Sequence, residues 1–489
     1  MTATLNDPTL FKSAAYVDGL WLAEGARGSY ALHNPSTGQK LADLPLMSAA
    51  QVAEAIDGAQ AAWTPWRRLA AKQRAVLLRR WFDLIIENTE DLARLIVLEE
   101  GKPFAEAKGE IGYAASFVEW FSEEAKRVRG DIFPAPEPSR RIVVVKEPVG
   151  VCAAITPWNF PAAMITRKAA PALAAGCTMV VKPASQTPLT ALALAELAAR
   201  AGIPKGVFNV VLGKAGEVGG ELTSNTLVRK ITFTGSTEIG RVLLGQASQT
   251  IKNVSMELGG NAPLVVFDDA DVDVAVDGMI ATKYRNTGQA CISANRAFVQ
   301  AGIYDEFVSR LSERVSALKV GDGFEPEVQQ GPLIDEQAVA KVEAHVADAT
   351  ARGARVITGG KRHSLGRHFY EPTVLADVSL DMLVTQEETF GPISPIVKFE
   401  TEDEAVTMAN ATEFGLAAYL FSRDAARIWR VAARIEAGMI GINTGLISNE
   451  IAPFGGVKQS GIGREGSVYG IEEFLEKKYL AWEGAGEAQ

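Results

Sequence analysis

The three cysteines of the 489-residue chain differ in what surrounds them. Cys291 lies in RNTGQACISANR, a polar, glycine-containing turn before an apolar segment, and this setting favours an accessible, reactive thiol. Cys152 lies inside an apolar run and Cys177 follows PALAAG, settings typical of inert, buried cysteines. The spacing of the three suggests neither a disulfide framework nor a zinc site, so no metal is expected. Cys291 is the candidate nucleophile, and an inert thiol is the alternative.

A carboxylate and an amide stand where they could assist a thiol. Glu257 in SMELGG ends a strand-like segment, at the sheet edge where ligands bind in α/β folds, so it is a candidate general base. Asn159 in ITPWNFP follows another strand, and rigid neighbours could hold its amide in one orientation as an oxyanion donor. A solvated strand-end carboxylate and a plain turn asparagine are the alternatives. The four histidines, in polar, loop-like or helix-surface contexts, are not expected to be catalytic.

Two glycine-containing segments compete as the dinucleotide-binding turn. GIGREG (461–466) fits the pattern G-x-G-x-x-G but follows the turn-like FGGVKQS rather than a strand, so we interpret it as a structural loop. FTGSTEIG (233–240) joins a strand to a helix. Gly235 would allow the tight turn, and Ser236 could cap the helix and leave its amides free for a pyrophosphate. The spacing is not that of the usual fingerprint, so this signal is weak by itself.

The segments that must position these residues alternate regularly. Residues 50–125 predict helices, and 131–149 predict a proline-rich loop followed by a strand. From residue 150, five apolar runs alternate with alanine-rich helices, which predicts parallel βαβ units in a doubly wound sheet. A second alternating series follows residue 261. The fold class is therefore α/β, with a Rossmann-like dinucleotide-binding domain, a second α/β catalytic domain and a small β element for oligomerisation.

The same patterns suggest a division into domains. We expect a cofactor-binding domain from 1–130 and 150–260, a catalytic domain from 261–450 and a return segment at 451–475. The strand-like KYLAW near the end has no helix to cover it. Because unpaired strand edges are normally covered, residues 131–149 and 476–489 are expected to be oligomerisation strands.

Composition narrows the function classes. With 47% hydrophobic and 22% charged residues, the chain is expected to be soluble and cytoplasmic, without a signal peptide or membrane span. The net charge of −10 argues against nucleic acid as a partner, but a few local arginines could still bind an anionic substrate.

Seven segments together resemble the signatures of the aldehyde dehydrogenase superfamily. They are TPWNFP, VVKPAS, FTGSTEIG, MELGGNAP, RNTGQACISANR, EETFGP and PFGGVKQSGIGREG, in family order and spread over roughly residues 10–485. The similarity is greatest to bacterial succinate-semialdehyde dehydrogenases. It implies the aldehyde dehydrogenase fold, a small semialdehyde as substrate and a homo-oligomer, either tetramer or dimer.

The resemblance implies a role for each matching residue. Cys291 would be the nucleophile, Asn159 the oxyanion donor and Glu257 the base that activates water. Residues that would bind the cofactor are Thr156, Pro157, Trp158, Asn159, Lys182, Pro183, Ala184, Ser185, Gly235, Ser236, Leu258, Glu388 and Phe390.

Cofactor and substrate preference follow from single positions. Ser185 stands where NAD-preferring relatives usually have a glutamate that would repel a 2′-phosphate, so NADP is expected, with NAD possible. Arg167, Arg285 and Ser448 match positions that grip the distal carboxylate of succinate semialdehyde, and paired arginines suit a planar carboxylate. The alternatives are glutarate semialdehyde, a broader aldehyde dehydrogenase, and a cofactor-free cysteine hydrolase, for which no histidine base is evident near Cys291.

Overall fold

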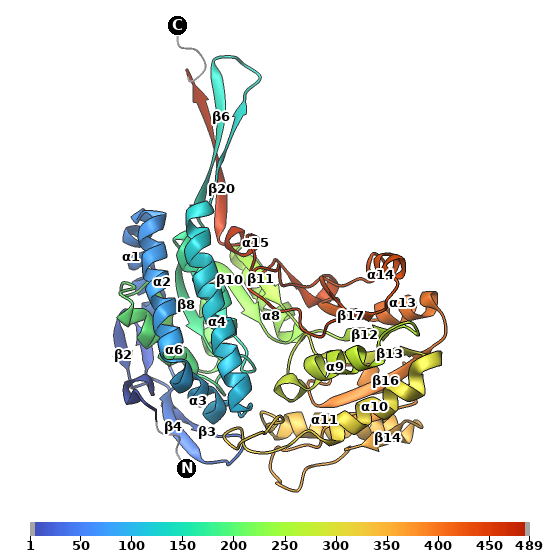
Figure 1. Ribbon diagram of the computed structural model, residues 1–489. Helices are drawn as coiled ribbons and strands as arrows, with labels where there is room; N and C mark the ends of the chain where they lie inside the picture. Colours follow the sequence, from blue (N-terminus) through green and yellow to red (C-terminus); the bar gives the residue numbers. More distant parts are fainter. Residues whose placement is uncertain (1–4, 485–489) are drawn as a thin grey trace.

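The computed structural model describes residues 5–484 and contains two α/β lobes with a projecting strand element (Figure 1). Residues 1–4 and 485–489 of the predicted ranges lie outside the described residues. Five parallel strands form the centre of the first sheet, in the order β11-β10-β7-β8-β9. They are β7 (Val151–Ile155), β8 (Thr178–Lys182), β9 (Phe208–Val210), β10 (Val228–Thr234) and β11 (Asn253–Glu257). The five runs predicted from the sequence are these five strands, and the α/β class is confirmed.

Helices connect and cover this sheet. The connecting helices are α5 (Ala163–Ala175), α6 (Leu189–Arg200), α7 (Ala215–Ser224) and α8 (Thr237–Ala247). Helices α1 (Ala49–Arg68), α2 (Ala71–Glu87), α3 (Thr89–Glu99) and α4 (Phe104–Glu124) come from the segment that the sequence predicts as helical. Buried alanines occupy most of α5, so the helix can pack closely against the neighbouring elements.

Three short strands extend the first sheet at its edges, antiparallel to their neighbours. They are β1 (Ala15–Val17), β2 (Leu20–Leu22) and β19 (Gly461–Ile462), the last paired with β11. A separate two-stranded sheet joins β3 (Ser29–His33) and β4 (Lys40–Pro45). The sequence pattern did not single out β1, β2 and β19, because two or three residues carry no recognisable alternation. It did not single out β3 and β4 either.

The second lobe has a seven-stranded sheet in the order β14-β15-β16-β13-β12-β17-β18, parallel except for β14. Its strands are β12 (Ala262–Val266), β13 (Ala294–Gln300), β14 (Arg355–Thr358), β15 (Thr373–Ala376), β16 (Ile393–Phe399), β17 (Ala417–Phe421) and β18 (Met439–Ile442). Its helices are α9 (Val272–Lys283), α10 (Tyr304–Ser316), α11 (Glu336–Ala351), α12 (Leu383–Gln386), α13 (Glu402–Asn410) and α14 (Ala425–Ala432). The sequence predicts all of these strands except β15.

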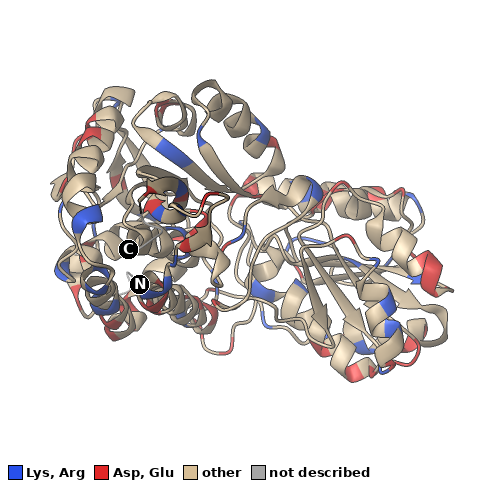
Figure 2. Ribbon diagram, turned by 90° about the horizontal axis from the view of Figure 1, so that it is seen from above, with Lys and Arg blue, Asp and Glu red and all other residues tan. Residues whose placement is uncertain are grey.

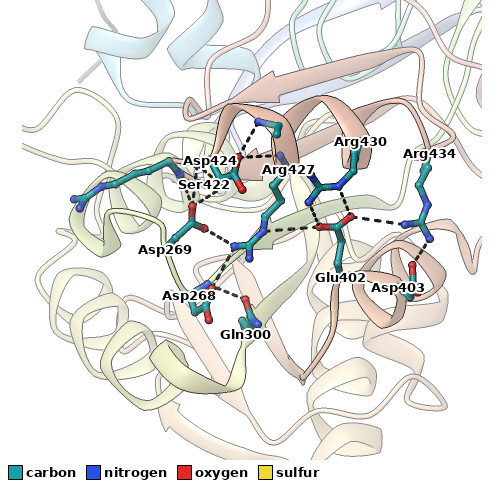
Figure 3. A network of polar contacts seen from close by, with 12 residues as sticks. Asp268, Asp269, Gln300, Glu402, Asp403, Ser422, Asp424, Arg427, Arg430 and Arg434 are labelled. Carbon is teal, nitrogen blue, oxygen red and sulfur yellow. Dashed lines mark hydrogen bonds and ion pairs between the residues drawn. The ribbon is translucent and has the colours of Figure 1, made fainter.

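A polar network holds α14 against the second lobe (Figure 3). Arg427 forms ion pairs with Asp268 and Asp269, at 3.2 and 2.7 Å, and lies 3.8 Å from Glu402. Arg430 pairs with the same Glu402 at 2.9 Å. Each partly exposed pair contributes little alone, but the network fixes where α14 sits relative to α13 and β12.

A third sheet projects from the first lobe (Figure 1). Strand β6 (Arg140–Pro148) pairs along its whole length with β20 (Leu475–Glu483), and β5 (Asp131–Pro134) pairs with the other edge of β6. The prediction of a loop over 131–139 was wrong for Asp131–Pro134, because these residues complete the sheet despite the prolines nearby. Helix α15 (Tyr469–Glu472) leads into β20.

Charges of both signs are interspersed over the helices of both lobes when the molecule is seen from above (Figure 2). Among residues 5–484, no helix combines the length and apolarity needed to cross a membrane.

Candidate active site

A cavity of about 290 Å³ lies where the carboxyl ends of β7, β10 and β11 meet the segment before β13. Ligands of open α/β sheets bind at this kind of edge. Predicted residues that line the cavity are Pro157, Trp158, Asn159, Arg167, Gly235, Ser236, Leu258, Arg285, Cys291, Glu388, Phe390 and Ser448. The structure thus brings the candidate nucleophile, oxyanion donor, cofactor residues and arginines to one cavity.

A strained turn presents Cys291 to this cavity. Asn286, Thr287 and Gly288 all have left-handed backbone conformations, with φ of 49°, 54° and 75°. Such a φ is unfavourable for the β-branched Thr287, whose hydroxyl donates a hydrogen bond to Gly331 O at 3.2 Å. The turn leaves Cys291 partly buried, while Cys152 and Cys177 are fully buried, as expected from the sequence.

The two glycines after Glu257 allow β11 to end close to the thiol. A Cβ on Gly260 would lie 2.4 Å from the carbonyl oxygen of Cys291, so no side chain fits there. A Cβ on Gly259 would lie 3.1 Å from Glu388 Oε2. The sequence GG therefore brings the end of β11 next to both Cys291 and Glu388.

Glu257 is buried, and its Oε2 has no hydrogen-bond partner among the described residues. Burial, and next the charge of Glu465, raise the pKa of Glu257 well above its ordinary value, while Arg167 and Lys168 act to lower it. A carboxyl group in such an environment is suited to take up a proton at neutral pH.

Burial also raises the pKa of Cys291, to about 12, and the charges of Glu388 and Glu257 act in the same direction. Arg167 opposes them. At neutral pH the resting group is a thiol, so a base must remove its proton before it can act as a nucleophile.

The Asn159 amide is held by the chain around it. Its Nδ2 donates to Gln289 O at 2.8 Å, which leaves the second Nδ2 hydrogen free to bind a ligand. The backbone carbonyl oxygen of Asn159 accepts hydrogen bonds from Lys102 Nζ at 2.7 Å and from Asn286 Nδ2 at 3.0 Å, whereas its side-chain Oδ1 has no hydrogen-bond partner among the described residues. Lys102 is itself buried and paired with Glu110 at 2.7 Å.

Two buried charges beside Arg167, those of Glu465 and Lys168, were not found from the sequence. Glu465 forms ion pairs with Arg167, at 2.5 Å from Nε, and with Lys168. Glu465 lies within GIGREG, and its carboxylate in a glycine-rich loop was the available signal. The expectation of a structural loop was wrong for Gly461 and Ile462, which form the short strand β19, and Gly461 packs directly on β11, where a Cβ would lie 2.1 Å from Met256 O.

The candidate cofactor residues line one end of the cavity. Ser236 caps α8, its Oγ accepting from Ile239 N at 3.3 Å, as the sequence predicts. The expectation that Gly235 is needed for the backbone conformation of a tight turn was wrong. This glycine has no left-handed φ, and a side chain is excluded because a Cβ would lie 2.3 Å from the Phe233 ring.

Glu388, Trp158 and Phe390 also line this end of the cavity, whereas Lys182 and Pro183 lie outside the lining residues. Glu388 accepts a hydrogen bond from Gly260 N at 3.1 Å, and burial raises its pKa to about 7. The rings of Trp158 and Phe390 meet edge to face, 5.6 Å apart. Burial lowers the pKa of Lys182 to about 8, and its Nζ donates to Pro183 O at 3.0 Å. Thr156 is buried after β7, and Ala184 and Ser185 follow β8 partly exposed, outside the residues that line the cavity.

The opposite end of the cavity combines cationic and aromatic side chains. Arg285 stacks over Phe160 at 4.9 Å, and Arg167 over Phe454 at 4.0 Å. The Nη2 of Arg167 is buried without a hydrogen-bond partner among residues 5–484. This donor is available to an anionic ligand, although Arg167 already pairs with Glu465.

The expectation that every histidine lies in a polar or surface context was wrong for His345. This residue is buried on α11, with Nδ1 3.1 Å from Thr389 Oγ1 and Nε2 3.4 Å from Glu387 Oε2. Burial lowers its pKa, so it supports the segment around Glu388 as a neutral ring. Helical periodicity did not reveal this, because a polar partner on another segment makes the burial possible.

Comparisons with known proteins agree with this geometry. The family described as the aldehyde dehydrogenase family matches residues 21–480. The chain is 62% identical over 480 residues to a glutarate-semialdehyde dehydrogenase of Pseudomonas aeruginosa, covering 98% of this chain and 99% of the relative. It is 60% identical over 476 residues to the succinate-semialdehyde dehydrogenase [NADP(+)] of Escherichia coli, covering 97% and 99%. A crystal structure of the succinate-semialdehyde dehydrogenase from Burkholderia pseudomallei has a TM-score of 0.98 and 59% identity, covering 98% of this chain and 100% of that one. The chain therefore belongs to the aldehyde dehydrogenase family of oxidoreductases.

Proposed function

We propose that the protein oxidises a short aldehyde with a distal carboxylate, succinate semialdehyde, to the dicarboxylate, with NADP as the preferred electron acceptor. The observation that carries the proposal is one cavity with Cys291 and Asn159 at its centre and Arg167 and Arg285 at one end. A cofactor-free cysteine hydrolase is a poorer account, because the buried His345 is engaged with Thr389 and Glu387 rather than with Cys291.

The catalytic steps follow from the environment of each group. Glu257 removes the proton of the Cys291 thiol, and the sulfur forms a bond to the aldehyde carbon. The free Nδ2 hydrogen of Asn159 donates to the oxygen on which negative charge develops. A bound nicotinamide supplies the two-electron acceptor that converts the adduct into a thioester. Once Glu257 has passed the thiol proton to solvent, it deprotonates a water molecule, which attacks the thioester, and the C–S bond breaks to release the acid and the Cys291 thiolate.

The residues at the other end of the cavity fit a dinucleotide. Aldehyde dehydrogenases use NAD or NADP. Ser236 caps α8 and leaves the first-turn amides of this helix available to a phosphate. The buried carboxylate of Glu388 would accept hydrogen bonds from ribose hydroxyls, and Trp158 and Phe390 form an aromatic wall for a flat ring.

We infer a preference for NADP from Ser185 and Lys182. A serine at 185 brings no negative charge, and Lys182 lies at the end of the adjacent strand β8. The expected result is a higher kcat/KM with NADP than with NAD. Ser185→Glu should lower kcat/KM for NADP at least about tenfold, by charge repulsion, and leave that for NAD nearly unchanged. A clear NAD advantage in the unaltered enzyme would refute the preference.

The substrate proposal rests on the cationic end of the cavity. Removal of Arg285 should raise KM for succinate semialdehyde about tenfold or more and spare butanal, which has the same chain length without charge. Arg285→Ala is the cleaner variant, because Arg167→Ala also removes the partner of buried Glu465. Equal losses on both aldehydes would contradict a carboxylate clamp.

Glutarate semialdehyde, longer by one methylene, is the second candidate substrate. The similarity to a relative with that name favours it. Apolar pockets discriminate a methylene by only about 1–3 kcal/mol, so the ratio of the two kcat/KM values decides between them.

We also propose the division into domains predicted from the sequence: a cofactor-binding domain from 1–130 and 150–260, a catalytic domain from 261–450, a return segment at 451–475, and oligomerisation strands at 131–149 and 476–489, of which 485–489 lie outside the described residues. The pairing of β5, β6 and β20 in one projecting sheet supports this role. The free cysteines described in the structure are compatible with a cytoplasmic location.

A further inference from the structure

Tyr113 on α4 faces the cationic end of the cavity and has no assigned role. It lines the same cavity as Arg167, Arg285 and Ser448. Its hydroxyl oxygen is buried and forms no well-aligned hydrogen bond within residues 5–484, although the side chain of Ser448 lies close enough to influence it. A buried polar group without a partner carries a substantial desolvation cost, so its presence calls for a ligand or a function.

The aromatic ring of Tyr113 is fixed by the residue one helical turn later. Its ring meets Phe117 edge to face, with centroids 5.0 Å apart and an interplanar angle of 69°. The guanidinium of Arg167 lies over the same Phe117 ring, 5.3 Å from its centroid. One buried aromatic ring therefore supports both the hydroxyl-bearing side chain and the cation.

Two cationic side chains lie near the hydroxyl of Tyr113 and influence its pKa. Burial raises the pKa of Tyr113, while Arg167, Arg285 and Ser448 act to lower it. The hydroxyl thus keeps its proton and lies within the field of both arginines. A neutral O–H donor beside two cations is complementary to an anion. An apolar ligand would leave this donor without a hydrogen bond.

We propose that Tyr113 is a specificity-determining residue whose hydroxyl donates a hydrogen bond to the distal carboxylate of the aldehyde, beside Arg167 and Arg285. The inference rests on the proposed function and deepens it, because it adds a neutral donor from α4 to a clamp formed by α5 and the turn before Cys291. A hydrogen bond to a charged acceptor is stronger than one between neutral groups, so the loss of this single atom is measurable.

Tyr113→Phe removes the hydroxyl and keeps the ring that packs on Phe117. Steady-state kinetics with succinate semialdehyde, glutarate semialdehyde, butanal and pentanal should be compared in the unaltered enzyme and in this variant. We expect KM for the two semialdehydes to rise about tenfold, with kcat nearly unchanged and the uncharged aldehydes unaffected. Tyr469→Phe, at a tyrosine that is 58% exposed, is the matched control and should change none of these values.

Each result has a distinct meaning. If the unaltered enzyme prefers the semialdehydes and Tyr113→Phe keeps that preference, the assignment of Tyr113 is overturned while the proposed function stands. Equal losses on charged and uncharged aldehydes also overturn it, because they indicate a structural role. If the unaltered enzyme shows no preference for a terminal carboxylate, the proposed function itself fails. Thermal unfolding of both variants checks that the packing of α4 is intact.

Discussion

The thiol of Cys291 and the carboxyl group of Glu257 share an environment that suppresses both negative charges. Burial is the main cause in each case, and the charge of Glu465 adds to it at Glu257, while the charges of Glu388 and Glu257 add to it at Cys291. Arg167 is the cation that opposes this effect at both groups. Cys291 lines the cavity and Glu257 lies buried beside the lining residue Leu258, and two groups with raised pKa values are suited to pass protons during a reaction rather than to rest as ions.

The pH dependence of the reaction follows from the sign of these shifts. Both raised pKa values mean that the groups are mainly protonated near neutral pH, and the first step requires one ionisation, because Glu257 must be deprotonated to accept the proton of the Cys291 thiol. We therefore expect kcat/KM to rise with pH, by up to about tenfold per unit, over the range from pH 6 to 9. Measurement of kcat/KM across this range checks the expectation. A flat or falling profile would contradict it, and Ser236→Ala serves as a control that should keep the slope.

At the scale of single residues, the sequence was informative where chemistry depends on residue type. Cys291, Asn159 and Glu388 could be selected from their neighbours and from the family resemblance, and all three line one cavity. Glu465 and Tyr113 could not, because their environment is formed by segments far away in the chain. A glycine is required at position 235 because of the orientation of the Phe233 ring, and no local sequence pattern predicts that orientation.

At the scale of elements, a buried ion pair connects the start of α4 with the loop that carries Asn159. Lys102 lies just before the helix, and its Nζ is within 4.0 Å of Glu100 and 2.7 Å of Glu110. Glu110 in turn accepts hydrogen bonds from the backbone of Ala162 and Ala163 at the start of α5. One lysine thus links α3, α4 and α5 beneath the cavity.

Replacing Lys102 should lower the stability of the folded protein. Lys102→Met leaves two buried carboxylates without their cation, so the free energy of unfolding should fall by about 3–5 kcal/mol. Lys108→Met removes a half-exposed lysine from the same helix and should change the free energy of unfolding by well under about 1 kcal/mol. Urea unfolding of both variants makes the comparison. Equal stability of the two would mean that the buried pair does not hold these elements together.

Periodicity located the elements that are long or fully buried. The five apolar runs became the parallel strands β7 to β11, because both faces of a parallel sheet are covered. The sequence did not predict four short strands, β1, β2, β15 and β19. Each has only two to four residues, which pair through the backbone and show no recognisable side-chain pattern. The sequence did not predict strand β5, because the prolines in and beside it suggested a loop. Prolines are tolerated in a strand at the edge of a sheet.

At the scale of the whole molecule, the cavity exists only because the carboxyl ends of strands in the first sheet meet segments that precede β13 and β16 in the second sheet. Sequence reasoning predicted both sheets, but their relative position depends on packing between segments hundreds of residues apart. The projecting sheet is the other feature of this scale. It presents Ile132, Phe133 and Trp482 with 73%, 49% and 60% of their surfaces exposed. Apolar side chains on an open sheet edge favour association with another copy of the chain.

A charged residue on this sheet should therefore weaken the oligomer. Ile132→Glu is expected to shift the protein to a smaller species in sedimentation velocity, because a carboxylate would be buried in the contact. Leu365→Glu, at a loop residue that is 52% exposed, is the control and should leave the distribution unchanged. An unaltered protein that sediments as a monomer would contradict the role of this sheet.

The central claim is that the aldehyde's acyl group is carried on Cys291 and released by water that Glu257 activates. In Glu257→Gln the thiol of Cys291 must ionise without its base, so the thioester should form slowly, and because water has lost the same base the thioester should be hydrolysed more slowly still and accumulate. Mass spectrometry of the variant, mixed with succinate semialdehyde and NADP and quenched in acid, is the most direct measurement. The account predicts one succinyl group per chain, on the peptide that contains Cys291. An unmodified Cys291, or acylation of Cys152 or Cys177 instead, would contradict it.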